Sequence, residues 1–416
     1  MADTVTDTCR RAAACAPALA RLDSAVKDAA LQAMADALLD SADDLAVANR
    51  EDVATAQGQG TSRALLDRLT LTSSRLEAMA SSLRAVAAQA DPIGEIVSGW
   101  RRPNGLTIEQ VRAPLGVIAV IYEARPNVTS DVAGLCLKSG NACVLRGSSI
   151  AARSNHAIVE VLRAGLASAG VPTDAVQLVA DASRASAKEL MTAKGLVDLL
   201  IPRGGAALIA SIEADASVPF IIDGDGNCHI YVDASADRAM ASEIVINAKT
   251  QRPSVCNALE TLVVHQALVE GWLPSTLDSL AAAGVEIRGD ERVVESWPQA
   301  TGADENDWST EYLDLVLAVK VVDSFDAAVA HINTYTTANA EGIVTTDLAA
   351  ARRFAAEIDA GSILINASTR FSDGGEFGYG AEIGISTQKL HARGPMGLRA
   401  LTSTKYVVWG EGHIRS

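Results

Sequence analysis

The residue whose type and setting most clearly suggest chemistry is Cys256, in the stretch Asn-Ala-Lys-Thr-Gln-Arg-Pro-Ser-Val-Cys-Asn-Ala-Leu-Glu-Thr-Leu-Val-Val-His at 247–265. Before it, residues 237–249 follow a helical pattern. After it, the apolar run 259–264 is typical of a buried strand. Pro253 ends the helix, so the backbone around the cysteine is irregular and offers amide groups to an oxyanion. The stretch predicts a nucleophilic thiol.

Two cations close to Cys256 in sequence, Lys249 and Arg252, would favour its thiolate. The alternative is that Cys256 is one more small buried hydrophobic residue. The chain contains six cysteines, which are Cys9, Cys15, Cys136, Cys143, Cys228 and Cys256. None forms a Cys-x-x-Cys motif or a paired Cys/His spacing, so we expect neither a metal site nor a disulfide framework.

Composition narrows the possible function classes. The 416 residues are 49% hydrophobic but only 4% aromatic, so a large core must be built mainly from Ala, Val, Leu and Ile. The formal net charge of −16 argues against a nucleic-acid partner or an anionic membrane. The N-terminus does not resemble a signal or transit peptide, and no apolar run is long enough to span a membrane. We therefore expect a cytoplasmic protein.

The N-terminal part is rich in helical patterns. Residues 4–58 predict three amphipathic helices with breaks near 22–24 and Ser41, and residues 73–89 predict a fourth. This segment suggests a helical layer over a sheet and carries no candidate chemistry. Glycine and proline then frame an alternating stretch within 98–113, which predicts a β-hairpin that could pair with another chain.

From residue 115 short apolar runs alternate with helical patterns. The predicted strands are 115–121, 142–145, 176–179, 197–201 and 218–222, and the predicted helices are 129–138, 154–169, 183–193 and 206–214. This alternation predicts an α/β fold with a doubly wound parallel sheet, in which ligands bind at the carboxyl ends of the strands.

Two turns at such strand ends combine glycine with arginine. One is Arg146-Gly147-Ser148-Ser149 and the other is Pro202-Arg203-Gly204-Gly205. Glycine lets backbone amides at a helix start approach an anion, and arginine supplies the counter-charge. The turns predict a phosphate-bearing cofactor, with plain strand-to-helix connections as the alternative. A G-x-G-x-x-G motif and a Walker A motif are both absent from the sequence.

A second α/β unit follows residue 228. Its predicted strands are 229–232, 259–264, 315–322, 343–345 and 363–365, and its predicted helices are 237–249, 266–282, 323–335 and 347–358. Residues 371–397 hold seven glycines and predict a long functional loop. Residues 401–408 return to a strand pattern.

Four stretches resemble the γ-glutamyl phosphate reductases of the aldehyde dehydrogenase superfamily. They are Tyr-Glu-Ala-Arg-Pro-Asn-Val at 122–128, Gly-Asn-Cys-His-Ile-Tyr-Val-Asp at 226–233, Gln-Arg-Pro-Ser-Val-Cys-Asn-Ala-Leu-Glu-Thr at 251–261 and Arg-Gly-Pro-Met-Gly-Leu-Arg-Ala-Leu-Thr-Ser-Thr-Lys-Tyr at 393–406. The resemblance implies a cofactor domain over 1–227, with an oligomerisation hairpin at 98–113. It also implies a catalytic domain over 228–366 and a return segment with an oligomerisation strand over 367–416.

The resemblance also implies roles for single residues. Cys256 matches the nucleophile of the superfamily. Arg146, with Ser148 and Ser149 beside it, matches the position that contacts the adenosine ribose or its phosphate. The other expected contacts with NADP(H) come from Gly204 and Gly205 at the pyrophosphate and from Glu311 at the nicotinamide ribose. No metal is expected.

The implied reaction is the NADPH-dependent reduction of L-glutamyl 5-phosphate to L-glutamate 5-semialdehyde, the second step of proline biosynthesis. A thioester on Cys256 would be its intermediate. Asn127 and the Cys256 amide are the expected oxyanion donors. Arg125 and Arg252 would bind the phosphate or the carboxylate of the substrate, or else form structural ion pairs. The family also implies a homo-oligomer and a possible complex with glutamate 5-kinase.

Three departures from related patterns bear on this interpretation. Asp223-Gly224-Asp225-Gly226 replaces the Glu-Leu-Gly-Gly segment that supplies the hydrolytic base of ordinary aldehyde dehydrogenases. Ile150 stands where the family pattern has an acidic residue, and Thr336 to Ala340 replaces an expected Gly-Ser-Gly-His-Thr. The loss of the glutamate base suits a thioester that exchanges with phosphate, and it argues against a hydrolytic aldehyde dehydrogenase, which is the first alternative. The second alternative is a catalytically silent assembly partner, against which Cys256 and the two Arg-Gly turns argue.

Overall fold

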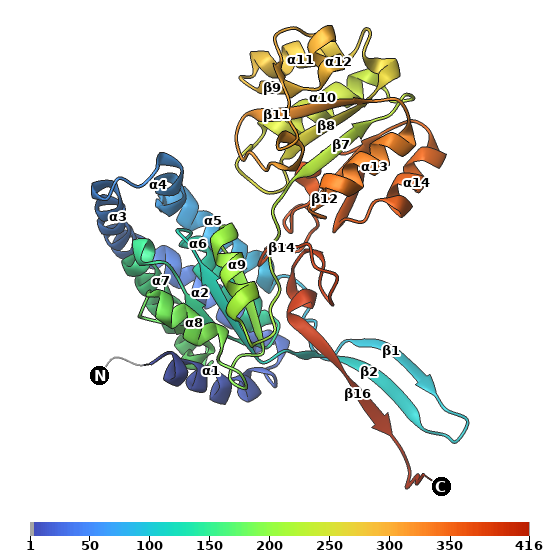
Figure 1. Cartoon of the computed structure of the whole chain (residues 1–416). Coiled ribbons are helices and arrows are strands. Elements are labelled where there is room, and N and C mark those ends of the chain that lie inside the picture. The colour runs from blue at the N-terminus through green and yellow to red at the C-terminus, as the bar shows by residue number, and fades with distance from the viewer. Residues whose placement is uncertain (1–3, 416) are drawn as a thin grey trace. The chain divides into compact units, whose positions relative to one another are not determined.

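The computed structural model describes residues 4–415, which form two compact units (Figure 1). The first unit contains the chain up to Ile222, Gly378–Gly384 and the chain from Met396 onward. The second contains Asp223–Phe377 and Ile385–Pro395. The N-terminal segment of the first unit thus ends at Ile222, and the domain bounds that the resemblance implies stay predictions. Within residues 4–415, no helix has the length and apolar character needed to cross a membrane.

A helical layer opens the first unit. Its helices are α1 (Val5–Leu19), α2 (Ser24–Asp40), α3 (Ala42–Gly58), α4 (Arg63–Leu69) and α5 (Ser73–Ala87). The four helices expected from the sequence are confirmed, whereas the short α4 was missed. Side-chain caps explain two of the starts: Thr4 Oγ1 accepts from the Asp7 amide at 3.1 Å, and Thr72 Oγ1 accepts from the Arg75 amide at 3.2 Å.

The sheet of the first unit is parallel and has the order β5-β4-β3-β6. Its strands are β3 (Val117–Tyr122), β4 (Ala142–Arg146), β5 (Val176–Leu178) and β6 (Leu199–Arg203). Its other helices are α6 (Asn127–Lys138), α7 (Ala152–Ser168), α8 (Arg184–Met191) and α9 (Ala206–Asp215), with 3-10 turns η1 (Ser149–Ala151) and η2 (Thr173–Ala175). Every residue of β3 is buried, as an inner parallel strand requires.

The expected fifth strand at 218–222 is wrong. This segment forms only an isolated bridge between Phe220 and Leu200 of β6. Pro219 has no amide hydrogen to donate, and the amides of Ser217 and Val218 donate to the Met191 carbonyl instead of to a strand. The segment exchanges two hydrogen bonds with Leu200, so it pairs with β6 at a single residue and does not form a strand.

The expected hairpin is present as β1 (Ile96–Arg101) and β2 (Thr107–Pro114), paired antiparallel. The C-terminal strand β16 (Thr402–Trp409) follows the turn η6 (Leu398–Leu401) and pairs with the other edge of β2. The three strands extend away from the helices of the first unit (Figure 1). Six large apolar side chains on this sheet are exposed: Ile96, Val97, Trp100, Tyr406, Val408 and Trp409.

The second unit is built on a seven-stranded parallel sheet of order β10-β9-β11-β8-β7-β12-β13. The strands are β7 (Cys228–Val232), β8 (Leu259–His265), β9 (Glu286–Gly289), β10 (Thr301–Gly302), β11 (Val316–Val322), β12 (Ala340–Val344) and β13 (Ser362–Ile365). The helices are α10 (Arg238–Thr250), α11 (Leu273–Ala282), α12 (Glu291–Ser296), α13 (Phe325–Tyr335) and α14 (Leu348–Glu357), with turns η3 (Gln266–Leu268), η4 (Asp307–Ser309) and η5 (Thr369–Phe371). Hydrophobic cores lie on both faces of this sheet.

Two sequence expectations for the second unit need correction. The single helix expected at 266–282 is divided into η3 and α11, because Gly271 between them has φ +84°, outside the helical region. The segment between α11 and β11, for which the sequence pattern predicts no element, contains β9, α12, β10 and η4. The glycine-rich tail contains one small antiparallel pair, β14 (Ile385–Ser386) with β15 (Gly394–Pro395).

Candidate active site

Cys256 lies in the loop between α10 and β8, directly before the start of a buried strand. It is partly exposed, whereas the other five cysteines of the chain are buried. The Ala258 amide donates to the Val255 carbonyl at 3.0 Å, which closes a tight turn around the thiol-bearing residue. Accessibility therefore separates Cys256 from the cysteines that serve only as small core residues.

The segment that enters β7 packs closely against the Cys256 backbone. The Cys228 thiol donates to the Cys256 carbonyl at 3.2 Å, and burial raises the pKa of Cys228 well above its usual value. A Cβ placed on Gly226 would lie only 1.8 Å from the Cys256 carbonyl oxygen. Only glycine permits this approach, so the position of the nucleophile is fixed by backbone contact.

A buried ion pair lies behind the loop. Lys249 Nζ contacts Glu260 Oε2 at 2.7 Å, and both side chains are fully buried. Burial raises the pKa of Glu260 to about 7 and lowers the pKa of Lys249, although the attraction within the pair opposes both shifts. We expected Lys249 to favour the Cys256 thiolate. Its ammonium group is directed to Glu260 instead, so the contact argues against that role. Glu260 is a charged residue within the apolar run 259–264, and a charge buried in a strand needs a partner of opposite charge.

Glu311 is held beside the same segment from another side. Its Oε1 accepts from the Gly226 amide at 2.8 Å. Burial raises the pKa of Glu311, and the Asp225 and Asp223 carboxylates add to the rise while the Gly226 amide opposes it. Glu311 Oε2 receives no hydrogen bond from residues 4–415, so this oxygen fits the expected contact with a ribose hydroxyl.

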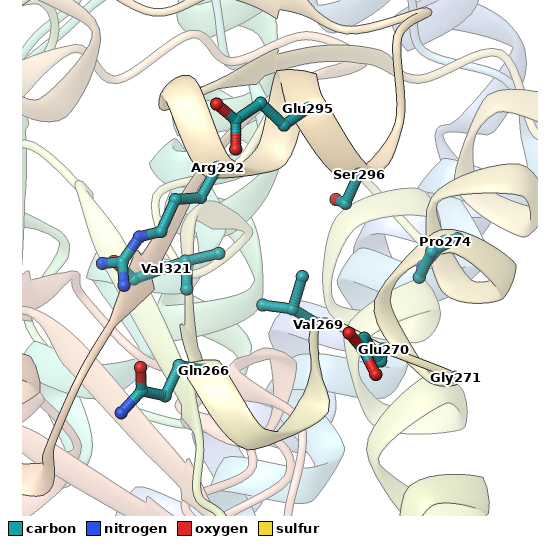
Figure 2. A pocket seen from close by; sticks show the side chains of 9 residues that line it. All are labelled: Gln266, Val269, Glu270, Gly271, Pro274, Arg292, Glu295, Ser296 and Val321. Atoms are coloured by element: carbon teal, nitrogen blue, oxygen red, sulfur yellow. The ribbon is translucent and has the colours of Figure 1, made fainter.

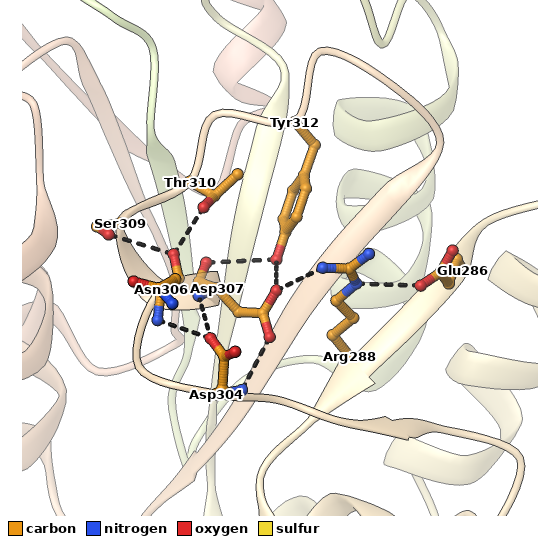
Figure 3. Close-up of polar contacts among 8 residues, drawn as sticks. All are labelled: Glu286, Arg288, Asp304, Asn306, Asp307, Ser309, Thr310 and Tyr312. Carbon is orange, nitrogen blue, oxygen red and sulfur yellow. Dashed lines mark hydrogen bonds and ion pairs between the residues drawn. The ribbon is translucent and has the colours of Figure 1, made fainter.

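The loop that carries Glu311 is anchored at both ends. Figure 3 shows Asp307 between Arg288 and Tyr312, with the Arg288 Nη1 to Asp307 Oδ1 distance at 2.7 Å and the Tyr312 hydroxyl at 2.8 Å from the same oxygen. On the other side the Leu313 amide donates to Glu260 Oε1 at 3.2 Å. Leu313 has φ +53°, a conformation that costs a side-chain-bearing residue about 1–2 kcal/mol. The buried Glu260 carboxylate stabilises this strained turn.

Arg370 is a candidate residue that the sequence did not reveal. It lies in η5 and is partly buried, and its Nε donates to Gln251 Oε1 at 2.8 Å. Arg252, Cys256 and Arg370 are close enough to interact electrostatically. Arg252 is exposed, and its guanidinium makes no hydrogen bond or ion pair with another of the described residues. Neither spacing nor a motif connects Arg370 with Cys256 along the chain, because η5 reaches the loop only through the fold.

The predicted cofactor residues of the first unit share one edge of its sheet. Strands β4 and β6 both pair parallel with β3, so Arg146, Ser148 and Ser149 after β4 lie on the same edge as Gly204 and Gly205 after β6. Arg146 Nη2 donates to the Ser183 carbonyl at 2.7 Å. Arg146 Nε and Ser148 Oγ are buried and have no hydrogen-bond partner. Such orphaned polar atoms fit a ligand that bears phosphate and hydroxyl groups.

The turn before α9 is open at Gly205 and crowded at Gly204, where a Cβ would lie 2.9 Å from side-chain atoms of Glu123 and Leu208. A Cβ on Gly205 would meet no atom within 4 Å, and Gly205 caps α9 without a side-chain hydrogen bond. The Gly205 amide donates to Glu123 Oε1 at 3.4 Å. The helix start therefore offers backbone amides, but one carboxylate lies beside it and would repel an anion.

The predicted oxyanion donor Asn127 and the predicted substrate ligand Arg125 belong to the first unit, while Cys256 belongs to the second. Asn127 begins α6, is exposed, and its Nδ2 donates to Asp131 Oδ2 at 3.0 Å. Arg125 is partly buried, and its amide donates to the Glu123 carbonyl. Their roles as oxyanion donor and as substrate ligand stay predictions.

The sequence departures have visible structural settings. Ile150 packs against a small apolar cluster that includes Leu69 and Ala124. Ala338 has φ +61°, a backbone region that favours the glycine of the family pattern, and the adjacent Asn339 is fully buried with both side-chain polar atoms unpartnered. Asn339 thus occupies a polar interior position and is not a surface substitution.

A hollow of the second unit lies away from Cys256. It measures about 640 Å³ and is lined by residues of η3, α11, α12, β11 and the loop between η3 and α11, among them Glu270, Arg292 and Glu295 (Figure 2). Gln266 lines this hollow and lies just after the C-terminal end of β8, whereas Cys256 lies before its N-terminal end. The two residues are therefore separated by the length of the strand, roughly 20 Å. No group of three or more His, Cys, Asp or Glu side chains within residues 4–415 is arranged to hold a metal ion.

Comparison with known proteins gives a consistent result. The model of the aldehyde dehydrogenase family matches residues 1–294 and 303–407. A γ-glutamyl phosphate reductase of Thermobifida fusca is 56% identical over 97% of both chains, and one of Moorella thermoacetica is 54% identical over 98% of this chain and 97% of the relative. The crystal structure of γ-glutamyl phosphate reductase from Thermotoga maritima superposes with a TM-score of 0.97 at 43% identity over 100% of both chains. This chain therefore belongs to the aldehyde dehydrogenase family, in the group of the γ-glutamyl phosphate reductases.

Proposed function

We propose that the chain reduces L-glutamyl 5-phosphate to L-glutamate 5-semialdehyde and phosphate with NADPH, as the second step of proline biosynthesis. The observation that carries this proposal is the setting of Cys256. It is the one partly exposed cysteine among six, and Gly226 packs directly against its backbone. Relatives named γ-glutamyl phosphate reductase that are 54–56% identical to this chain give the substrate class.

The steps follow from the residues that surround the thiol. The Cys256 sulfur attacks the acyl carbon, a C–S bond forms, and the C–O bond to phosphate breaks with its electron pair leaving on the phosphate. The resulting thioester stays on Cys256. Its carbonyl oxygen gains charge during attack, and the Cys256 amide together with Asn127 are the donors that we assign to it. The semialdehyde is released when the C–S bond breaks.

The cofactor contacts are assigned to the residues that fit it. A bound NADPH supplies the hydride that reduces the thioester to the aldehyde level. Arg146, Ser148 and Ser149 would hold the adenosine ribose and its phosphate, with support from the buried unpartnered Arg146 Nε and Ser148 Oγ. Gly204 and Gly205 would admit the pyrophosphate, and Glu311 would hold the nicotinamide ribose. Arg125 and Arg252 are assigned to the anionic groups of the substrate.

The experiment runs the reaction backwards. Pyrroline-5-carboxylate, which is in equilibrium with the semialdehyde, is mixed with NADP, inorganic phosphate and the full chain, and the absorbance of NADPH is followed. Cys256→Ala serves as the matched variant, since it removes only the sulfur. NADPH formation that requires both phosphate and Cys256 is the expected result. Absence of NADPH under every condition would favour the silent assembly partner.

A hydrolytic aldehyde dehydrogenase is the second candidate, and Asp225 is the observation in its favour. This exposed carboxylate precedes Gly226, the residue packed on the Cys256 carbonyl. Asp225 lies two residues after Asp223, which stands where the hydrolytic enzymes have their glutamate base and whose Oδ1 accepts from the Ile385 amide at 3.0 Å. NADPH formation at an equal rate without phosphate, lost in Asp225→Asn, would establish hydrolysis.

We also propose a homo-oligomer formed through the three-stranded sheet of β1, β2 and β16. The exposed Trp100 and Tyr406 rings lie 6.2 Å apart on this sheet, and large exposed apolar groups favour burial in an interface. Light scattering of the chain and of Tyr406→Lys tests this, because a charge in the interface lowers the measured mass. A cytoplasmic location and a complex with glutamate 5-kinase stay predictions.

A further inference from the structure

The turn η5 lies along the loop of Cys256 and is tied to it at two places. Arg370 Nε donates to Gln251 Oε1 at 2.8 Å, before the nucleophile in sequence. Asn257 Nδ2 donates to the Ser372 carbonyl at 2.9 Å, after the nucleophile. These two bonds hold Arg370 against residues 251–257, although more than a hundred residues separate the two segments.

Arg370 and Arg252 carry like charges and repel each other next to Cys256. Burial lowers the pKa of Arg370, and the Arg252 charge lowers it further, while the Asp373 carboxylate and Cys256 act in the opposite direction. Gln251, the hydrogen-bond partner of Arg370, is neutral. Asp373 accepts from the Gly375 amide at 2.8 Å and so is partly engaged within its own turn. The Asp373 carboxylate thus offsets the charge of Arg370 only in part, and an added anion would relieve the repulsion between the two guanidinium groups.

We propose that Arg370, together with Arg252, forms the binding site for the phosphate group next to Cys256. This inference rests on the function proposed above. In the forward reaction the two arginines hold the phosphoryl group while the Cys256 sulfur forms the C–S bond and the C–O bond to phosphate breaks. In reverse they hold inorganic phosphate while its oxygen attacks the thioester carbon and the thiolate leaves. No electron transfer occurs in this step, and planar guanidinium groups match phosphate oxygens in pairs.

Kinetics of the reverse reaction test the assignment with Arg370→Gln and Arg370→Lys. We expect Arg370→Gln to raise the KM for phosphate about 10- to 100-fold, the loss typical of a charge-assisted hydrogen bond, and to change the KM for the semialdehyde less than about 2-fold. Arg370→Lys keeps the charge and loses the paired geometry, so its KM for phosphate should lie between. A rise confined to the semialdehyde KM would assign Arg370 to the substrate carboxylate and overturn the proposal.

The matched control is Arg353→Gln, which removes another arginine of the same unit. Arg353 is exposed, lies in α14 and pairs with Asp326 and Glu357 at 2.8 Å each. Its loss should leave both KM values unchanged. An equal rise in the KM for phosphate in Arg353→Gln would show that overall charge, and not a site at Arg370, governs phosphate affinity.

A second readout does not depend on turnover. Cys256 is the partly exposed cysteine, so iodoacetamide should alkylate it first, and peptide mass spectrometry verifies the position. Inorganic phosphate should slow this alkylation in the natural chain and in Arg353→Gln, but not in Arg370→Gln. Protection that persists in Arg370→Gln would overturn the inference.

The two readouts keep the inference and the proposed function apart. Phosphate protection that requires Arg370, found without any phosphate-dependent NADPH formation, would support the phosphate site and contradict the proposed reaction. Phosphate-dependent NADPH formation with an unchanged KM for phosphate in both Arg370 variants would support the reaction and contradict the site.

Discussion

The turns after β4 and β6 in the first unit and the loop of Cys256 in the second unit differ in how their buried charged groups are satisfied, although the neutral Asn257 Oδ1 in the loop of Cys256 is also unpartnered. The first region keeps buried polar atoms without partners, at Arg146 and Ser148, and open space beside Gly205. The second pairs its fully buried charges, Lys249 with Glu260, and packs Gly226 against the nucleophile backbone. Unmet polar groups suit a ligand that comes and goes, whereas a nucleophile must be held by the protein itself.

The largest effect should come from breaking the buried pair with Lys249→Met. The ionised Glu260 would then lie unpaired in the interior, which typically costs about 3–5 kcal/mol in unfolding free energy. Lys188→Met is the control from the first unit: its partner Asp215 lies 2.9 Å away at the surface, so its loss should cost less than about 1 kcal/mol. Urea unfolding of both variants measures the difference.

The same variant has a pH dependence with a definite sign. The pKa of Glu260 is already raised to about 7 in the folded protein, and Lys249 lowers it, so Lys249→Met raises it further. The folded state then binds a proton more readily than the unfolded state. Stability is therefore highest below the ordinary carboxyl pKa and decreases as the pH rises toward the raised value. The cost of Lys249→Met should be larger at about pH 8 than at about pH 5, and an equal cost at both would contradict an unpaired carboxylate.

Placing one methyl group in each region sharpens the comparison. Gly226→Ala forces the new Cβ onto the Cys256 carbonyl, and we expect a loss of about 1–3 kcal/mol together with most of the activity. Gly205→Ala meets open space and should cost at most about 1 kcal/mol, the weaker preference for alanine at a helix N-cap. Thermal unfolding and the rate of Cys256 alkylation are measured for both. Similar losses of stability in the two variants would show that the backbone is packed equally closely in both regions.

The smallest expected effect is on cofactor affinity. Glu123→Gln keeps an acceptor for the Gly205 amide and removes the negative charge beside the start of α9. We expect the KM for NADPH to fall about 2- to 5-fold at low salt, the usual size of a charge effect at a helix terminus, and the gain to shrink at high salt. Glu357→Gln on α14 is the control and should change nothing. A higher KM in Glu123→Gln would mean that this carboxylate contributes to cofactor binding.

Local patterns predicted most of the elements that carry these regions. The sequence predicted the helix before Cys256, the strand after it and the break at Pro253, because capping, apolar periodicity and proline act over a few residues. The same local rules failed at 218–222, where strand pairing was decided by distant carbonyl groups, and at 266–282, where the left-handed Gly271 divides the helix.

The sequence by itself determined the α/β class, the hairpin and the identity of Cys256 as the candidate nucleophile, because each depends on residue type and short spacing. Only the tertiary structure decided that Lys249 is paired with Glu260, that Glu311 accepts from the Gly226 amide, and that Arg370 lies at the loop of Cys256. The physical reason is that charges interact through space, while the distance between residues along the chain says little about which charges a folded sheet will bring together.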